Sequence, residues 1–540
     1  MDRTRFEQVL ARRASRRALI GIGAAGVAAL SLPGRPTRLL AGQATPLASP
    51  AATPAGAAGP FALGVASGDP LPDGVVLWTR LAPDPLAPFG GMEGQPAVEV
   101  RWEVTEDESF GRLVAQGTTT ATPELAHSVH VDATGLAPGR EYVYRFLAAG
   151  EASPVGRTKT APPPDAALDR LRFAFASCSH YEHGYFAPYR HLAAEDLDLV
   201  LHLGDYIYEY PAGEEFLPSG GPPVRLHLGG ETVTLADYRL RHALYKTDPD
   251  LQSAHAAFPW VVTWDDHEVE NNYADSRSEN GDPGEDFLVR RADAYQAYYE
   301  HLPLRPASLP QGPAMQLYRR LAFGTLLDIA MLDTRQYRSD HPCGDDIQVR
   351  CAAGLDPNAT MTGPEQERWL LAGLDASSTR WHAIGQQVMM AQLDTRPGPA
   401  ETFVSDLWDG YPAARNRILG HLLHAGTPNA VVLTGDIHAN WVNDLKADFL
   451  DPASATVATE FVTTSITADN PVGAQLPFLL PDNPHIKHVD ALHGYTRCEV
   501  TADRWLTELR TVEHVASPDV PIATSAAFVV ENGRPGAVPA

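Results

Sequence analysis

The chain has 540 residues and a formal net charge of −25 at pH 7. This length is enough for two or three domains. The strong acidity argues against a nucleic-acid-binding protein, because such binding depends on cationic contacts with phosphates. We therefore expect no sequence-specific nucleic-acid partner.

Residues 1–44 have the pattern of an export signal. Arg16-Arg17 in the run SRRALI precedes the apolar stretch 18–32, which glycines interrupt. That stretch is too short and too rich in glycine to span a bilayer. The pattern indicates a twin-arginine signal, so we expect the Tat export machinery as a partner. The protein would be secreted, periplasmic or associated with the cell wall, without stable membrane insertion. The alternative is a basic amphipathic N-terminus.

The pattern of residues 45–160 predicts a linker followed by a small all-β domain. Residues 45–60 are rich in Pro, Ala and Gly, which predicts a disordered linker. Residues 98–107 and 140–150 alternate apolar and polar side chains, as strands do. We expect a β-sandwich of the immunoglobulin or fibronectin type over residues 61–160, serving as a scaffold or lid.

From residue 171 to residue 515 the pattern changes to short apolar strands that alternate with helices. Helical periodicity covers residues 286–302, 364–377 and 413–426, among others. The alternation predicts a layered α/β domain with buried sheets. Residues 495–512 predict a closing hairpin. We expect residues 516–540 to form a C-terminal tail.

The four cysteines predict different environments. Cys343 and Cys351 flank a short polar loop, and in an exported protein this spacing favours a local disulfide. Cys498 lies in a late strand, where a buried small apolar residue is expected. Cys178 follows an apolar strand, so it is either inert in the core or a thiolate that faces a cleft.

Four polar segments, here called the loop tips, each follow an apolar strand. They are residues 177–181, 204–208, 264–268 and 435–440. In open α/β sheets, ligands bind beyond the carboxyl ends of the strands. The loop tips therefore predict a multinuclear metal site assembled from distant parts of the chain.

The second loop tip carries Asp205 and, three residues later, Tyr208. A carboxylate can bridge two cations through its two oxygens. A phenolate is a hard donor, and a strongly Lewis-acidic ion such as Fe(III) can lower its pKa from about 10. The alternative is a turn aspartate beside a buried aromatic ring.

The third and fourth loop tips combine carboxylates with imidazoles. In the third, Asp265 and Asp266 precede His267, which is a candidate proton donor to a leaving oxygen, and Glu268 is a candidate to orient it. In the fourth, Asp436 and His438 alternate and can reach one site only if the backbone stays extended. Oxygen-rich ligand sets favour Ca²⁺, Mg²⁺ or Mn²⁺, and Cys178 and Tyr208 would add charge for one harder, redox-capable ion.

Several segments together resemble the alkaline phosphatase D (PhoD-like) family of exported metallophosphatases. They are FALGVASGDPLPDGVVLWTRL (61–81), FASCSHY, LHLGDYIYEY, TWDDHEVENNY, LDTRQYR (332–338), LTGDIHANWV and FVTTSIT. The family is similar in plan to purple acid phosphatases and calcineurin-like phosphoesterases. The resemblance implies a metallophosphoesterase-like α/β sandwich, with two central sheets flanked by helices, after the small all-β domain.

The resemblance also implies a site with one Fe(III) and two Ca²⁺. Cys178, Asp205 and Tyr208 would bind iron, and Asp205, Asp266 and Asp436 would serve calcium. Asp265 and His438 are further ligands that the resemblance does not divide between the ions. In the related phosphoesterases, Asp-x-His, Gly-Asn-His and Gly-His-x-His occupy the first, third and fourth tips. This chain has Cys178, Asp266 and Asp436 at three of those ligand positions.

The expected activity is a secreted, metal-dependent phosphoesterase, an alkaline phosphatase or phosphodiesterase. It would hydrolyse small-molecule phosphate mono- and diesters by direct attack of a metal-bound hydroxide. Arg335 is a candidate for a bidentate clamp on a phosphate oxygen, with Asn272 and Asn440 as weaker candidates. An ion pair of Arg335 with Asp333 or another core acid is the alternative.

Two other functions remain open from the residues. An exported calcium-binding adhesin or lectin-like module would use the acidic tips as structural calcium sites, although Cys178 and Tyr208 would be unusual calcium ligands. Another metallohydrolase, such as an amidase or lactonase, would use the same ions.

Overall fold

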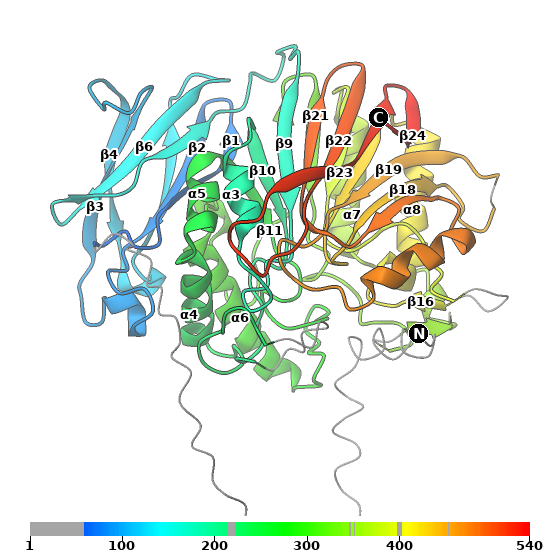
Figure 1. Ribbon diagram of the computed structural model, residues 1–540, viewed down its shortest axis with the longest axis horizontal. Coiled ribbons are helices and arrows are strands. Elements are labelled where there is room, and N and C mark those ends of the chain that lie inside the picture. Colours follow the sequence, from blue (N-terminus) through cyan, green and yellow to red (C-terminus); the bar gives the residue numbers. More distant parts are fainter. Residues whose placement is uncertain (1–58, 214–221, 345–346, 350, 397–401, 452) are drawn as a thin grey trace, which may run out of the picture.

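Two large β-sheets packed face to face form the centre of the protein (Figure 1). The computed structural model describes residues 59–213, 222–344, 347–349, 351–396, 402–451 and 453–540. The expected export signal, and nearly all of the expected linker, lie outside the described residues.

The first sheet has ten strands. In spatial order they are β24 (Arg534–Pro539), β23 (Ile522–Glu531), β22 (Arg504–Val512), β21 (His493–Val500), β9 (Leu171–Ala176), β10 (Leu199–Leu203), β11 (Pro259–Thr263), β1 (Val65–Leu71), β2 (Gly74–Arg80) and β5 (Ser128–Thr134). Strands β9, β10 and β11 run parallel, so their carboxyl ends meet at one edge. The expected hairpin over 495–512 is confirmed as the antiparallel pair β21 and β22.

The second sheet has seven strands, again with a parallel centre. In order they are β12 (Arg319–Phe323), β13 (Leu327–Met331), β15 (Trp381–Gly385), β17 (Ala430–Thr434), β19 (Thr456–Val462), β18 (Asn440–Lys446) and β20 (Ile486–Asp490). Two short strands, β14 (Ile347–Val349) and β16 (Thr402–Val404), pair separately.

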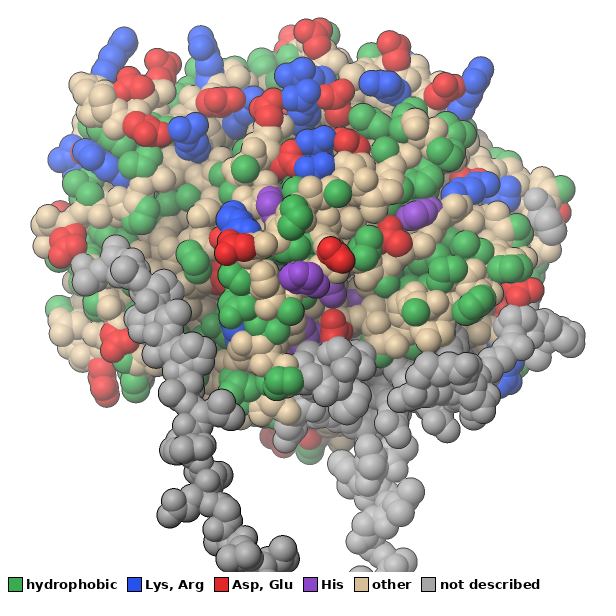
Figure 2. Space-filling view, viewed as in Figure 1, with side chains coloured by type: hydrophobic (Ala, Val, Ile, Leu, Met, Phe, Trp, Pro, Cys, Tyr) green, Lys and Arg blue, Asp and Glu red, His purple; other side chains and the backbone are tan. Residues whose placement is uncertain are grey.

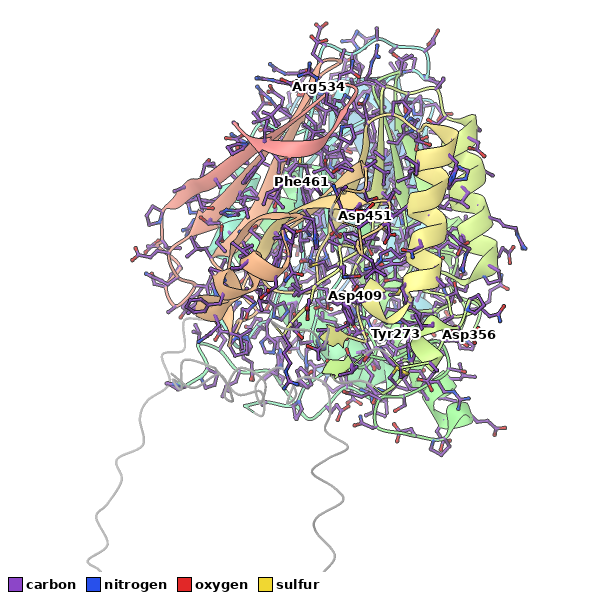
Figure 3. All side chains as sticks on the ribbon, turned by 90° about the vertical axis from the view of Figure 1, so that its right-hand side faces the viewer. Tyr273, Asp356, Asp409, Asp451, Phe461 and Arg534 are labelled. Carbon is purple, nitrogen blue, oxygen red and sulfur yellow. A yellow bond between two sulfur atoms is a disulfide. The ribbon has the colours of Figure 1, made fainter. Side chains whose placement is uncertain are left out.

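Alternation along the strands explains the packing of the layers. In β9, Phe173 and Phe175 point into the core between the sheets, while Ala174 and Ala176 face the helices. The outer face of the ten-stranded sheet is covered by α3 (Ala187–Ala193), α4 (Leu235–Lys246), α5 (Pro249–Ala257) and α6 (Gly284–His301). Figure 3 shows α7 (Gly363–Ala376) and α8 (Pro412–Ala425) side by side on the outer face of the seven-stranded sheet. The expected class, two central sheets flanked by helices, is confirmed.

Six 3₁₀ helices connect these elements in the part of the chain that the structure describes. They are η1 (Pro88–Gly91), η2 (Pro123–Leu125), η3 (Pro306–Ser308), η4 (Ala353–Leu355), η5 (Trp408–Gly410) and η6 (Gly473–Asp482). Among the described residues, no helix has both the length and the apolar character needed to cross a membrane.

The all-β region is fused to the main sheet. Its outer layer is β4 (Leu113–Ala121), β3 (Val98–Thr105), β6 (Glu141–Ala148), β7 (Glu151–Ala152) and β8 (Gly156–Lys159). The facing layer consists of β1, β2 and β5, and β1 runs parallel to β11 with Ser67 opposite Pro259. An all-β sandwich over these residues is therefore present, but one of its layers continues the ten-stranded sheet.

Residues 522–539 form a β-hairpin within the expected C-terminal tail. Strands β23 and β24 pair with each other, and β23 pairs with β22 along the edge of the main sheet. Phe528, Val530 and Ala537 are buried and join the core between the sheets. Because the segment is rich in Ala, Pro and Val, its sequence shows no clear alternation of apolar and polar residues, and the strands could not be recognised from it.

Candidate metal centre

All four loop tips meet at the edge where the parallel strands end. The first three follow β9, β10 and β11, and the fourth follows β17 of the other sheet. Ser177 forms a parallel bridge with Ser465, and the amide of Cys178 donates to the carbonyl of Gly204. On the face shown in Figure 2, histidine and carboxylate side chains gather near the middle of the surface.

The tips have unusual backbone conformations. Cys178, Asp205, Asp436 and His438 all adopt left-handed φ values, between 53° and 63°. Such values are uncommon outside glycine and concentrate at functional sites. At Gly204, with φ of 108°, an added Cβ would lie 2.4 Å from Cβ of Asp265, so only glycine allows the second and third tips to approach this closely.

Six of the seven predicted ligands, together with His267, fall into three adjoining groups, each with its ligand atoms within 4.8 Å of one another. The groups are Cys178 with Asp205 and His438, Asp205 with Asp266 and His267, and Asp265 with Asp266 and Asp436. Asp205 and Asp266 each belong to two groups, which is the position required of a ligand that bridges ions. The structure thus brings all seven predicted metal ligands to one place, since Tyr208 contacts Asp205.

Three carboxylate oxygens at this site have no hydrogen-bond partner among the described residues. They are Oδ1 of Asp205, Oδ2 of Asp265 and Oδ1 of Asp266, and all are buried. A buried, unpartnered carboxylate oxygen is costly unless a cation neutralises it. The residues present therefore fit the metal cofactor that the resemblance implies.

The pKa values point the same way. Burial, reinforced by neighbouring carboxylates, raises the pKa of Asp205 and Asp436 well above the usual range, and burial raises that of Asp265 to about 7. Burial also opposes ionisation of Asp266, but Arg335 and His267 outweigh it and hold the pKa of Asp266 below its usual value. Positive charge added at this site would favour the ionised form of every one of these carboxylates.

Tyr208 connects two of the predicted ligands. Its hydroxyl donates to Oδ2 of Asp205 at 3.0 Å and lies 3.0 Å from Nε2 of His438. Burial and the charge of Asp205 raise the pKa of the Cys178 thiol. A thiol and a phenol in this setting act as charged donors only when a cation is bound next to them.

His267 is oriented by Glu209, which the sequence did not indicate. Nδ1 of His267 lies 2.7 Å from Oε2 of Glu209, and this pairing outweighs burial and holds the pKa of His267 well above its usual value. Glu268, expected in that role, instead accepts the amides of Asp205, Tyr206 and Asp265 and so ties the second and third tips together.

Arg335 is completely buried beside the carboxylates. Its Nε donates to Oδ1 of Asp265 at 2.5 Å, and Nη1 and Nη2 donate to the two oxygens of Asp406 at 2.7 and 3.0 Å. Nη2 also lies 3.5 Å from Asp266. The ion-pair alternative is therefore present, with Asp265 and Asp406 as partners, whereas Asp333 accepts only the backbone amide of Arg335. Because Asp406 occupies the bidentate face, any contact of Arg335 with phosphate must use its remaining N–H groups.

Other expectations for the tips need correction or remain untested. The backbone at Asp436 and His438 is a left-handed turn, not an extended strand, and the two side chains belong to different ligand groups. The Asn440 side chain binds Asp490 and the amide of Thr464, which uses both ends of its amide. Asn272 donates its backbone amide to Asp266 at 2.6 Å, and its role in binding phosphate stays a prediction.

The two cysteine predictions away from the site are confirmed. Cys343 and Cys351 form a disulfide, and Cys498 is a free thiol buried between the sheets.

Comparisons with known proteins agree with this geometry. The sequence profile described as PhoD-like phosphatase matches residues 173–509, and that of the PhoD-like phosphatase N-terminal domain matches residues 47–162. Alkaline phosphatase D of Bacillus subtilis (strain 168) is 50% identical over 480 residues, which cover 88% of this chain and 82% of the relative. A solved structure of PhoD is 49% identical with a TM-score of 0.86, covering 89% of this chain and 92% of that one.

These matches cover both the all-β region and the layered domain, and they extend over most of each chain compared. They give no support to the adhesin alternative. A profile over more than half of the chain and a relative at 50% identity settle the classification: the chain belongs to the PhoD-like phosphatase family and is a phosphoesterase.

Proposed function

We propose that this phosphoesterase is exported by the twin-arginine route and hydrolyses small phosphate mono- and diesters with the help of one Fe(III) and two Ca²⁺. The observation that carries the metal requirement is a set of three buried carboxylate oxygens, on Asp205, Asp265 and Asp266, that accept no hydrogen bond from the described residues. Of the three, Oδ1 of Asp266 is 3.5 Å from Nη2 of Arg335. Twin arginines before a short apolar stretch support the export route.

The chemistry of the donors supports the division of the ions. The proposed iron ligands combine a soft donor, the thiolate of Cys178, with hard anionic oxygens from Asp205 and Tyr208, and His438 is in contact with them. This combination suits iron. Asp205, Asp265, Asp266 and Asp436 supply only oxygens, as calcium prefers. When bound, the ions would activate water as a nucleophile and neutralise charge on the phosphoryl oxygens.

His267 is proposed to protonate the leaving oxygen. Glu209 binds Nδ1 at 2.7 Å and leaves Nε2 available to the substrate. The pairing with Glu209 raises the pKa of His267 and so favours the protonated imidazolium that a general acid requires.

Arg335 is proposed to bind a phosphoryl oxygen through one of its remaining N–H groups. Nη2 is 3.5 Å from Asp266 and 4.0 Å from Asp436, so the guanidinium borders the carboxylates that would hold the ions. A phosphoryl oxygen held by those ions would lie within its reach, and an arginine so placed stabilises charge that develops in the transition state.

Metal analysis combined with two assays tests this function. We expect iron and calcium in the purified full-length protein, and hydrolysis of both nitrophenyl phosphate and bis-nitrophenyl phosphate. EGTA should abolish both activities, and added Ca²⁺ should restore them. Full activity after exhaustive chelation, or a metal-loaded protein that cleaves an amide or lactone but neither phosphate ester, would refute the proposal.

A further inference from the structure

We propose that Asp406 is a positioning residue that fixes the guanidinium of Arg335 for contact with substrate phosphate. Asp406 lies outside every loop tip and outside the three groups of predicted ligands. The inference rests on the proposed function, in which Arg335 binds a phosphoryl oxygen.

Asp406 is the centre of a buried ionic network. Its two oxygens accept Nη1 and Nη2 of Arg335 at 2.7 and 3.0 Å. Oδ1 also accepts Nη1 of Arg338 at 2.9 Å and lies 2.8 Å from Nε2 of His341. Asp406 is 6% exposed and Arg335 is 0% exposed, so water does not weaken these contacts.

This network determines which N–H groups of Arg335 remain free to bind substrate. A guanidinium has five N–H groups, and here one binds Asp265 while two bind Asp406. The bidentate pair fixes the plane of the guanidinium as well as its position. One N–H on each terminal nitrogen remains, and Nη2 is 3.5 Å from Asp266, on the side of the predicted ligands.

Arg338 holds Asp406 in turn. Besides the contact with Oδ1, its Nη2 donates to the backbone carbonyl of Asp406 at 2.6 Å. Because one arginine binds both the side chain and the backbone of Asp406, the carboxylate cannot turn without breaking contacts at two places. A catalytic group held through such a supporting partner keeps the geometry that the reaction needs.

The disulfide loop fixes the segment that carries Asp406. Strand β16 ends at Val404, two residues before Asp406, and pairs with β14, which lies between Cys343 and Cys351. The hydroxyl of Ser405 donates to the carbonyl of Gly344 at 2.5 Å. The backbone that leads into Asp406 is therefore anchored.

Asp406→Asn in the metal-loaded protein tests the inference. The amide has the shape of the carboxylate but can accept only through one oxygen, so the bidentate pair with Arg335 is lost. We expect the inhibition constant of inorganic phosphate and the KM for nitrophenyl phosphate to rise by about 10- to 100-fold. Metal content should stay at the wild-type value, and kcat should change less than KM.

Asp409→Asn is the matched control. Asp409, labelled in Figure 3, lies just before α8 and forms an equally buried ion pair with Arg415 at 2.5 Å that includes none of the predicted ligands. Its loss disturbs the same region of the chain but leaves Arg335 and Asp406 paired. We expect lower thermal stability with phosphate inhibition unchanged.

The possible results are distinguishable. Wild-type phosphate inhibition in Asp406→Asn, together with weakened inhibition in Arg335→Lys, would refute this inference alone. Metal loss from Asp406→Asn at saturating metal would also refute it, because Asp406 would then act on the ligands. Unchanged inhibition in Arg335→Lys would refute the role of Arg335, and an inactive wild-type protein would refute the proposed function. If Asp406→Asn does not fold, Asp406→Glu replaces it, with the same expected rise in both constants.

Discussion

The Tyr208 hydroxyl donates a hydrogen bond of 3.0 Å to Oδ2 of Asp205. This contact leaves Oδ1 of Asp205 as the oxygen without a partner. If a bound ion displaced the phenolic proton to solvent, Oδ2 would lose its donor as well, so both carboxylate oxygens would become available. In this arrangement, metal binding would convert the phenol to a phenolate and at the same time release the second oxygen of the bridging carboxylate.

Removing the bridge should remove the metal. Asp205 belongs to two of the three ligand groups, so we expect Asp205→Ala to lose bound metal and phosphoesterase activity together. Loss of a supporting partner of a metal ligand costs about 10- to 100-fold, and a shared ligand should cost more. Metal content and turnover are the measurements. The control is Asp328→Ala, which breaks the partly buried ion pair between Asp328 on β13 and Arg320 on β12. Full turnover in Asp205→Ala would contradict the assignment.

Tyr208 and Cys178 should give the protein a colour. Phenolate and thiolate bound to Fe(III) produce charge-transfer absorption in the visible range. We expect the wild-type protein to show such a band, Tyr208→Phe to shift or lose it, and Cys178→Ser to alter it separately. Visible spectra of samples with equal iron content are the measurement. A band that both variants retain would exclude these two side chains as iron ligands.

The loop tips could be predicted from the sequence because each one depends on local order: an apolar strand followed at once by polar residues. Parallel strands then bring such tips to one edge whatever the details of packing. The supporting residues could not be predicted this way. Glu209 acts on His267 across 58 positions, and Asp406 acts on Arg335 across 71. These pairings exist only once the segments have packed, and no spacing rule connects them.

The same distinction applies to the fold. Helices α6, α7 and α8 were predicted from local helical periodicity, and the structure places them within two residues of the predicted bounds. The parallel pairing of β1 with β11 could not be predicted. A strand that belongs to the large sheet and also to the all-β sandwich has the same alternation of apolar and polar residues as any other strand. Pairing partners of strands are set by tertiary contacts, which a pattern of burial alone does not specify.

The pairing of Glu209 with His267 should govern the alkaline limb of the pH–rate profile. A general acid is active when protonated, so the rate falls as pH rises through the pKa of His267. Glu209→Gln removes the negative charge that raises this pKa. We therefore expect the alkaline limb to move to lower pH.

The choice of substrate provides the control for this prediction. Nitrophenolate leaves without protonation, whereas an alkoxide needs a proton. Glu209→Gln should therefore slow hydrolysis of alkyl phosphates more than that of nitrophenyl phosphate. Equal losses for both substrates, with an unmoved alkaline limb, would show that His267 is not the proton donor.

The disulfide should contribute to stability and to phosphate binding. The double variant Cys343→Ser, Cys351→Ser releases the loop that anchors β16 and the segment with Asp406. A closed loop of this size contributes about 2 to 3 kcal/mol in the chain-entropy account. We expect a lower melting temperature and weaker inhibition by inorganic phosphate. Dithiothreitol should have the same two effects on the wild-type protein and no further effect on the double variant, which controls for any action of the reductant on iron. A wild-type inhibition constant for phosphate in the double variant would contradict the prediction.

Lys246 should make the stability of the protein increase with pH above neutrality. Its side chain is 2% exposed, with the ammonium 4.3 Å from the centre of the Trp78 ring. Burial lowers the pKa of Lys246 to about 7, whereas an unfolded lysine has a pKa of about 10.4. Between these values the unfolded chain binds one more proton than the folded chain. The free energy of unfolding should therefore rise by about 1.4 kcal/mol per pH unit from this residue.

Lys246→Met isolates this contribution, because other buried groups also titrate in the same range. The difference in unfolding free energy, wild type minus variant, should increase steadily from pH 7 to pH 10 when measured by denaturant titration. Below pH 7 the lysine is charged in both states, so the difference should be constant there. A difference that does not change between pH 7 and pH 10 would show that Lys246 is charged in the folded protein, held by the face of Trp78 against the cost of burial.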